Sequence, residues 1–196
     1  MMIIEFIICL LLIMVHRTVQ LQLINQQLYS PQWKGPSPNW FDKEMMTHGG
    51  YLIESYNKLS GKELVSMELY RKDPEKAIKE MFMNCNRIVL SHGTQKDNDG
   101  PILNYGNTAA LKLFAADWES LTKMPSKFTA CTEVDRDLRQ KFMQTVTDKG
   151  YVDNYTGVRI GLNKVKFAIK EAEVWNIVIQ GTYFGQAASF EKYEFL

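Results

Sequence analysis

The chain has 196 residues, of which 45% are hydrophobic and 23% are charged, and its formal net charge is +1. This composition is ordinary for a soluble globular protein, and the length suits one domain with an N-terminal extension. A net charge so close to zero creates no general attraction for nucleic acid, so a nucleic-acid partner is not expected.

The N-terminus carries an apolar run from Ile3 to Val15, which Glu5 interrupts and which His16-Arg17 follow. The run is shorter than the roughly 20 residues of a membrane span, and it lacks the basic start and the cleavage site of a secretory signal. Three interpretations stay open: a short membrane anchor, a buried or interfacial helix, and residues upstream of the true start. The charge order would leave the body of an anchored protein in the cytoplasm, so the expected location is cytoplasmic, with an N-terminal membrane anchor under the first interpretation.

The next segment divides into a linker and a helical region. Residues 1–38 are assigned to the hydrophobic segment and a linker, because the prolines near the end of this stretch block a helix. Residues 39–83 are predicted to be helical. The first helix, over 39–59, has an Asn39 cap, a weak point at Gly49-Gly50, and an apolar stripe formed by Phe41, Met45, Leu52 and Tyr56. Asp73 and Pro74 are typical of the start of another helix.

From residue 84 the pattern changes to short β-favouring runs. Strands are predicted at 87–91, 101–105, 155–160, 165–170 and 184–190, and helices at 109–114 and 135–148, with a polar turn at 96–100. The helix at 135–148 is expected to bury Leu138, Phe142 and Val146 and to leave Arg139 in water. Consecutive hairpins favour an antiparallel sheet, so the fold class is α+β, with helices on one face and N-terminal helices before it.

Short stretches between residues 91 and 188 carry a family resemblance. They are SHGT at 91–94, NYGN at 104–107, YTGVRI at 155–160, VWN at 174–176 and GQAA at 185–188. In this order they resemble the MEKHLA domain family, which is PAS-related, in its stand-alone bacterial and algal form. The resemblance implies that 84–196 is a PAS-like module with a role in redox, light or small-ligand sensing, or in regulated dimerisation. The chain departs from the pattern in a long polar stretch at 96–100 and in Lys127, where an arginine is expected.

Candidate ligand contacts follow from this PAS-like arrangement. The corner at 104–107 borders the central pocket of PAS-like folds, and the final strands offer aromatic and polar side chains for an apolar cavity. The same side chains can equally fill a solid core. The candidate ligand-binding residues are His92, Asn104, Tyr105, Asn107, Tyr155, Arg159, Phe167, Trp175 and Gln186.

No catalytic or metal-binding pattern emerges from the sequence. Ser91 and His92 are neighbours on a predicted strand, so their side chains point to opposite faces and cannot pair easily. The sequence contains no Gly-x-Ser-x-Gly elbow, no histidine spacing for a metal and no dinucleotide fingerprint. The cysteines are read as reduced and structural. We therefore expect a non-catalytic, PAS-like sensory or small-ligand-binding regulatory module whose cofactor is unknown.

The alternative is a protein–protein interaction module without a ligand. It would homodimerise through its sheet or through the helix at 39–59. The expected partners are therefore a small molecule or a second copy of the chain.

Overall fold

The computed structural model describes residues 43–196, except for the side chains of Glu133, Val134 and Gln140. The N-terminal apolar run, the linker, Cys9 and Phe41 lie outside the described residues. Within the described part, no helix has the length and apolarity that a membrane span requires.

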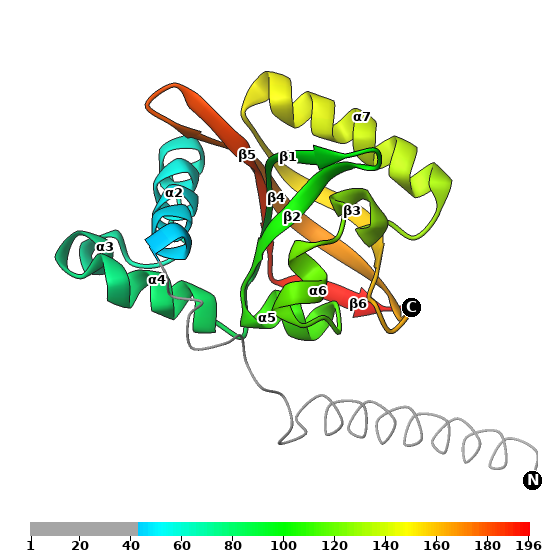
Figure 1. Cartoon of the computed structure of the whole chain (residues 1–196), viewed down its shortest axis with the longest axis horizontal. Helices are drawn as coiled ribbons and strands as arrows, with labels where there is room; N and C mark the ends of the chain where they lie inside the picture. Colours follow the sequence, from blue (N-terminus) through cyan, green and yellow to red (C-terminus); the bar gives the residue numbers. More distant parts are fainter. Residues whose placement is uncertain (1–42) are drawn as a thin grey trace, which may run out of the picture. The chain divides into compact units, whose positions relative to one another are not determined.

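A six-stranded antiparallel sheet forms the centre of the described unit (Figure 1). Its strands are β1 (Ile88–Asp97), β2 (Gly100–Gly106), β3 (Tyr151–Ile160), β4 (Lys166–Ile179), β5 (Thr182–Phe190) and β6 (Lys192–Phe195). The strand order is β2-β1-β5-β4-β3, and β6 also pairs with β4. Strand β3 pairs along one edge of β4. Along the opposite edge of β4, strand β5 pairs with one part and strand β6 with the other.

The sheet is surrounded by short and long helices. They are α2 (Lys43–Ser60), α3 (Met67–Lys72), α4 (Pro74–Met83), α5 (Thr108–Leu113), α6 (Trp118–Thr122), the 3-10 helix η2 (Ser126–Thr129) and α7 (Glu133–Lys149). Their starts follow the predicted signals. Asp73 accepts a hydrogen bond from the Lys76 amide over 3.0 Å, beside Pro74, and Asn107 caps α5 through the Ala110 amide, also over 3.0 Å.

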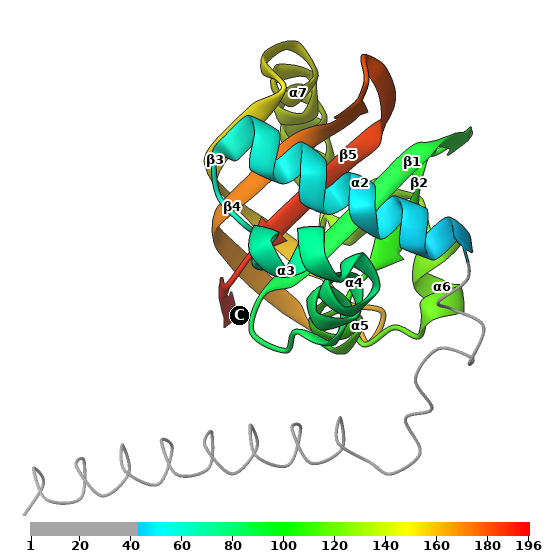
Figure 2. The same cartoon turned by 90° about the vertical axis from the view of Figure 1, so that its left-hand side faces the viewer.

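Helices cover both faces of the sheet (Figure 2). Two neighbouring residues of β4 show this, because successive strand residues point to opposite faces. Trp175 Nε1 donates to Ser55 Oγ of α2 over 3.0 Å, whereas Asn176 Nδ2 donates to the Thr147 carbonyl of α7 over 3.1 Å. The predicted α+β class, with an antiparallel sheet and a preceding helix, is confirmed, and α2 in addition covers the second face.

Helix α2 packs closely against both the sheet and α4. Its predicted residues Met45, Leu52 and Tyr56 are buried. The helix is continuous through its glycines, and a Cβ added at Gly49 would lie only 2.6 Å from Ile78 Cγ2. The glycine thus permits a close approach of two helices rather than breaking one.

A carboxylate anchors the C-terminal part of α2 to the sheet. Glu173 of β4 accepts hydrogen bonds from Tyr56 of α2, from Lys62 and, over 2.7 Å, from the Tyr151 hydroxyl of β3. The Tyr56 and Trp175 rings also pack together, with their centroids 4.8 Å apart. Polar and aromatic contacts therefore fix the register of the helix on the sheet.

Candidate functional site

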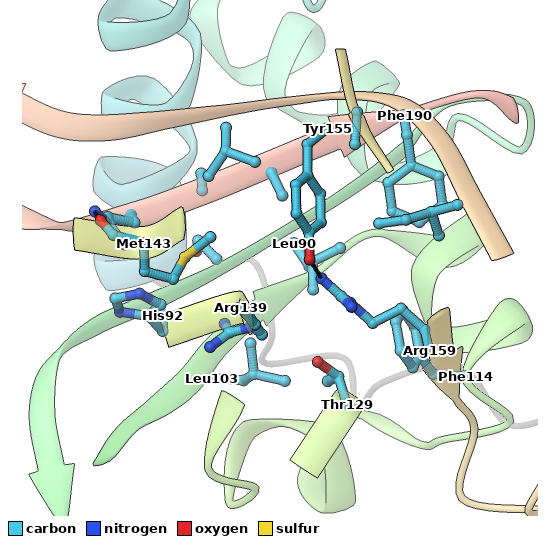
Figure 3. A pocket seen from close by; sticks show the side chains of 17 residues that line it. Leu90, His92, Leu103, Phe114, Thr129, Arg139, Met143, Tyr155, Arg159 and Phe190 are labelled. Atoms are coloured by element: carbon cyan, nitrogen blue, oxygen red, sulfur yellow. Dashed lines mark hydrogen bonds between the residues drawn. The ribbon is translucent and has the colours of Figure 1, made fainter. Parts of the chain in front are cut away.

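A small cavity of about 50 Å³ lies between the sheet and α7 (Figure 3). Its apolar wall includes Leu90, Leu103, Phe114, Ile169, Val174 and Phe190. Polar side chains reach it from different elements and include His92 of β1, Arg139 of α7, Tyr155 and Arg159 of β3, and Gln186 of β5. The site is thus an apolar space with a few convergent polar groups, as small-molecule sites require.

Arg159 enters this cavity from β3 and is only 6% exposed. Its Nη2 donates to the Tyr155 hydroxyl over 2.9 Å and its Nη1 to the Val158 carbonyl over 2.8 Å. Tyr155 and Arg159 lie on the same face of the strand with Gly157 between them, and the hydroxyl of Tyr155 meets the guanidinium in Figure 3. A Cβ at Gly157 would lie 2.7 Å from the Tyr155 hydroxyl and 3.1 Å from Arg159 Nη1. The missing side chain therefore makes room for this contact.

Arg139 enters the cavity from α7, where it is partly buried. Its Nη2 donates to Ser126 Oγ over 3.2 Å. Burial, followed by the positive charge of Arg159, lowers the pKa of Arg139 to about 10. The two guanidinium groups are therefore close enough to repel each other, and Arg139 stays protonated near neutral pH.

Gln186 and His92 complete the polar part of the cavity. Gln186 Nε2 lies 3.0 Å from Asn176 Oδ1 and 3.0 Å from Thr147 Oγ1, so it joins β5 to β4 and to the end of α7. His92 Nδ1 lies 3.0 Å from the Gly93 carbonyl, which only a protonated nitrogen can satisfy. Burial is the main cause that lowers the pKa of His92, and the charge of Arg139 adds to it. His92 is therefore a neutral donor–acceptor group in the cavity wall.

The structure brings together four of the predicted site residues: His92, Tyr155, Arg159 and Gln186 line the cavity. The other five lie elsewhere, so their ligand contacts stay predictions. Trp175 donates to Ser55 of α2, and the ring of Tyr105 lies near that of Phe82 of α4. The ring of Phe167 packs against Phe114, and Asn104 accepts a hydrogen bond from Ser91. Asn107 forms hydrogen bonds with backbone groups of Arg87, Val89 and Ala110.

Arg139 is the functional candidate that the sequence reasoning missed. It was expected to face water, and Leu138 was expected to be buried, but Leu138 is 61% exposed while Arg139 and Met143 line the cavity. The prediction for Phe142 and Val146 was better, because Val146 is buried and Phe142 stacks on Tyr155. A search for apolar periodicity cannot find a charged residue that faces a cavity.

Ser91 takes part in a different polar cluster, on the α2 face of the sheet. Its hydroxyl donates to Asn104 Oδ1 over 2.8 Å and lies 2.8 Å from His48 Nε2 of α2. His92 instead faces the cavity, as expected for neighbouring strand residues. Burial lowers the pKa of His48 to about 4, so this histidine is neutral near pH 7. This partly buried cluster joins α2 to β1 and β2.

The described residues also bear on metal binding and on thiol chemistry. Among them, no group of His, Cys, Asp and Glu side chains is arranged to hold a metal ion. Cys85 and Cys131 are free thiols.

The sequence matches the MEKHLA domain over residues 46–195. No curated protein matches the chain. Among solved structures, a PAS domain from Colwellia psychrerythraea is similar with a TM-score of 0.51 and 10% identity, over 61% of this chain and 98% of the other. A Rhodobacter sphaeroides LOV protein gives a TM-score of 0.46 and 6% identity, over 57% of this chain and 61% of the other. At 10% identity, the similarity to the Colwellia PAS domain establishes a shared fold and nothing further.

Proposed function

The chain belongs to the MEKHLA domain family, and from this premise we propose that it is a non-catalytic regulatory module that senses a small ligand in the cavity between the sheet and α7. One observation carries the proposal: polar side chains from α7, β1, β3 and β5 converge on a single apolar space. Convergent polar groups in an apolar cavity are what a specific small-molecule site needs.

The size of the cavity limits the ligand. A water needs roughly 10–15 Å³ of such space, so about 50 Å³ holds a compact ligand of a few heavy atoms. Sites for drug-sized ligands occupy roughly 300–1,000 Å³. We therefore propose no flavin or other large chromophore for this cavity.

The position of the cavity supports a regulatory role. Val174 lines it, while the next residue, Trp175, donates to Ser55 of α2 on the opposite face of the sheet. A ligand that displaces β4 would therefore act on the contact between the sheet and α2. Gln186 extends the same cavity wall to the end of α7 through Thr147. Two long helices are thus within reach of one binding event.

Ligand binding can be tested on the full chain by nuclear magnetic resonance with a panel of compact metabolites. We expect saturable shifts of amide signals at the cavity, and we expect Ala188→Met, which fills the cavity, to abolish them. Ala168→Met, on β4 at a position that does not line the cavity, is the matched control and should bind like wild type. Saturable shifts that survive in Ala188→Met would refute the site. If no compound shifts these signals, the space is a packing defect and the proposal fails.

A second candidate function is self-association through β6. In residues 43–196, β6 pairs only with β4, and Tyr193, Phe195 and Leu196 are exposed beside it. A strand edge of this kind is a ready template for a second chain. The apolar stripe of α2 is already buried, so the sheet is the better supported route to a homodimer. Sedimentation at high micromolar concentration should show a dimer that Phe195→Lys dissociates, and a monomeric wild type would remove this candidate.

A further inference from the structure

Two arginines share the cavity without an acidic partner. Among the side chains that the structure describes, neither Arg139 nor Arg159 forms an ion pair, and the acceptors of both are uncharged: Ser126 Oγ, the Val158 carbonyl and the Tyr155 hydroxyl. The ion pairs of the described residues use other cations, mostly lysines at the surface, such as Lys170 with Glu194. Among the described residues, no carboxylate forms an ion pair with either of the two guanidinium groups that line the cavity.

Such an arrangement is costly for a protein without a ligand. A charge that leaves water loses its hydration, and two like charges near each other add repulsion. An anion placed between them would remove both costs, because each guanidinium has five N–H donors in a fork that fits a carboxylate. The arginines therefore point to an anionic ligand.

The rest of the cavity defines the other end of this ligand. Leu90, Leu103, Ile169 and Val174 form an apolar wall. The volume of about 50 Å³ corresponds to roughly three to five water-sized groups. A carboxylate with one to three further carbons has this size and this division into a charged and an apolar end.

We infer that the cavity binds a short-chain carboxylate, of the size of acetate to butyrate, between Arg139 and Arg159. This inference rests on the proposed ligand-sensing function and names the ligand class of the same site. The carboxylate accepts hydrogen bonds from both guanidinium groups, and its alkyl end lies against the apolar wall. Inorganic phosphate and chloride match the charge but leave this wall uncovered.

The test uses the full chain, titrated with acetate, propionate and butyrate and followed by calorimetry and by the arginine Nε–H signals. Propionamide and propanol are the neutral probes of similar size, and inorganic phosphate and chloride are the anions without an alkyl end. We expect carboxylates to bind at least tenfold more tightly than any of these, and to shift the signals of both arginines.

Substitutions separate the role of the two arginines from net charge. Arg139→Gln and Arg159→Gln should each weaken carboxylate binding at least tenfold, whereas Lys141→Gln, an exposed charge on the same helix as Arg139, should leave it unchanged. If a glutamine variant does not fold, Arg139→Lys or Arg159→Lys retains the charge and loses the fork, and a severalfold weakening is expected. Unchanged carboxylate binding in folded variants of both arginines would overturn the inference.

The remaining outcomes distinguish this inference from the proposed function. Neutral probes that bind the cavity as tightly as carboxylates would overturn the ligand class and leave the sensing function in place. Phosphate or chloride binding as tight as that of propionate would likewise overturn a short-chain carboxylate. If no probe of any kind shifts the cavity signals, both proposals fall.

Discussion

The uncompensated charge of Arg139 sets an expectation for stability. Arg139→Met keeps most of the side-chain volume and removes the repulsion with Arg159, at the loss of one hydrogen bond to Ser126. Replacing poorly compensated buried charges with apolar groups is often neutral or stabilising. We therefore expect the ligand-free variant to gain about 1 kcal/mol and to melt a few degrees higher.

Thermal unfolding by circular dichroism checks this expectation. Arg87→Met is the control, because Arg87 forms an ion pair with Glu191 and should not be stabilised by losing its charge. A melting temperature of Arg139→Met several degrees below wild type would contradict the account of an unfavourable charge.

His48 makes stability depend on pH. In the unfolded chain it takes up a proton near pH 6.5, whereas burial in the folded protein lowers its pKa to about 4. The unfolded state therefore binds more protons between these values, so stability is complete above pH 6.5 and falls as the pH drops toward 4. The largest loss from this group is about 3 kcal/mol, since each pKa unit is worth about 1.36 kcal/mol.

Urea unfolding at several pH values tests the contribution of His48. His48→Gln can still donate to Ser91 and should show a shallower decline of the unfolding free energy between pH 6.5 and 4. The decline should not disappear, because the pKa of His92 is lowered as well. Identical pH profiles for wild type and variant would exclude His48 as a source of the acid sensitivity.

At the level of elements, Asn107 joins the ends of several segments. Its Oδ1 accepts from the Val89 and Ala110 amides, each over 3.0 Å, and its Nδ2 donates to the Arg87 carbonyl over 2.7 Å. Asn107→Ala should cost about 3 kcal/mol, since it leaves buried polar groups without partners. Asn163→Ala removes one similar bond at an exposed turn and should cost about 1 kcal/mol or less. Chemical unfolding of both variants checks the difference, and equal costs would contradict it.

Elements with strong local signals could be predicted from the sequence. Asp73 with Pro74 and Asn107 start helices as expected, because a cap acts within one turn of the chain. Strand β6 was missed, and β1 runs on to Asp97 through a stretch read as a turn. The end of β1 at Lys96-Asp97 is polar on both faces and shows no alternation of apolar and polar residues. Strand β6 does alternate, but over only four residues, which is too short for a strong pattern signal.

The cavity could be predicted only in part, for a reason that lies in packing. Tyr155 and Arg159 share a strand face with Gly157 between them, and this spacing is visible in the sequence. Arg139 is distant in the sequence, and its place in the cavity depends on the rotation of α7 about its axis. An exposed Leu138 next to an inward arginine contradicts ordinary amphipathic patterns. Only the assembled tertiary structure reveals this rotation.

For the whole molecule, the coverage of both sheet faces determines which truncated forms of the protein fold. A chain that begins at residue 84 matches the predicted module but lacks α2, so Trp175 and its neighbours would be exposed. We expect this chain to aggregate or to lose cooperative unfolding, because a large apolar face is uncovered. A chain that begins at Lys43 keeps α2 and should unfold cooperatively in calorimetry. A soluble, cooperatively folded 84–196 would show that α2 is dispensable.

The buried indole of Trp175 also gives the molecule an optical reporter. Its ring is fully buried against Tyr56, its Nε1 is bonded to Ser55, and its neighbour Val174 lines the cavity on the other side of the sheet. An indole that gains contact with water emits at longer wavelength. In a variant whose other tryptophans, Trp33, Trp40 and Trp118, are replaced by phenylalanine, the fluorescence spectrum of Trp175 therefore distinguishes a ligand that only fills the cavity from one whose binding loosens α2.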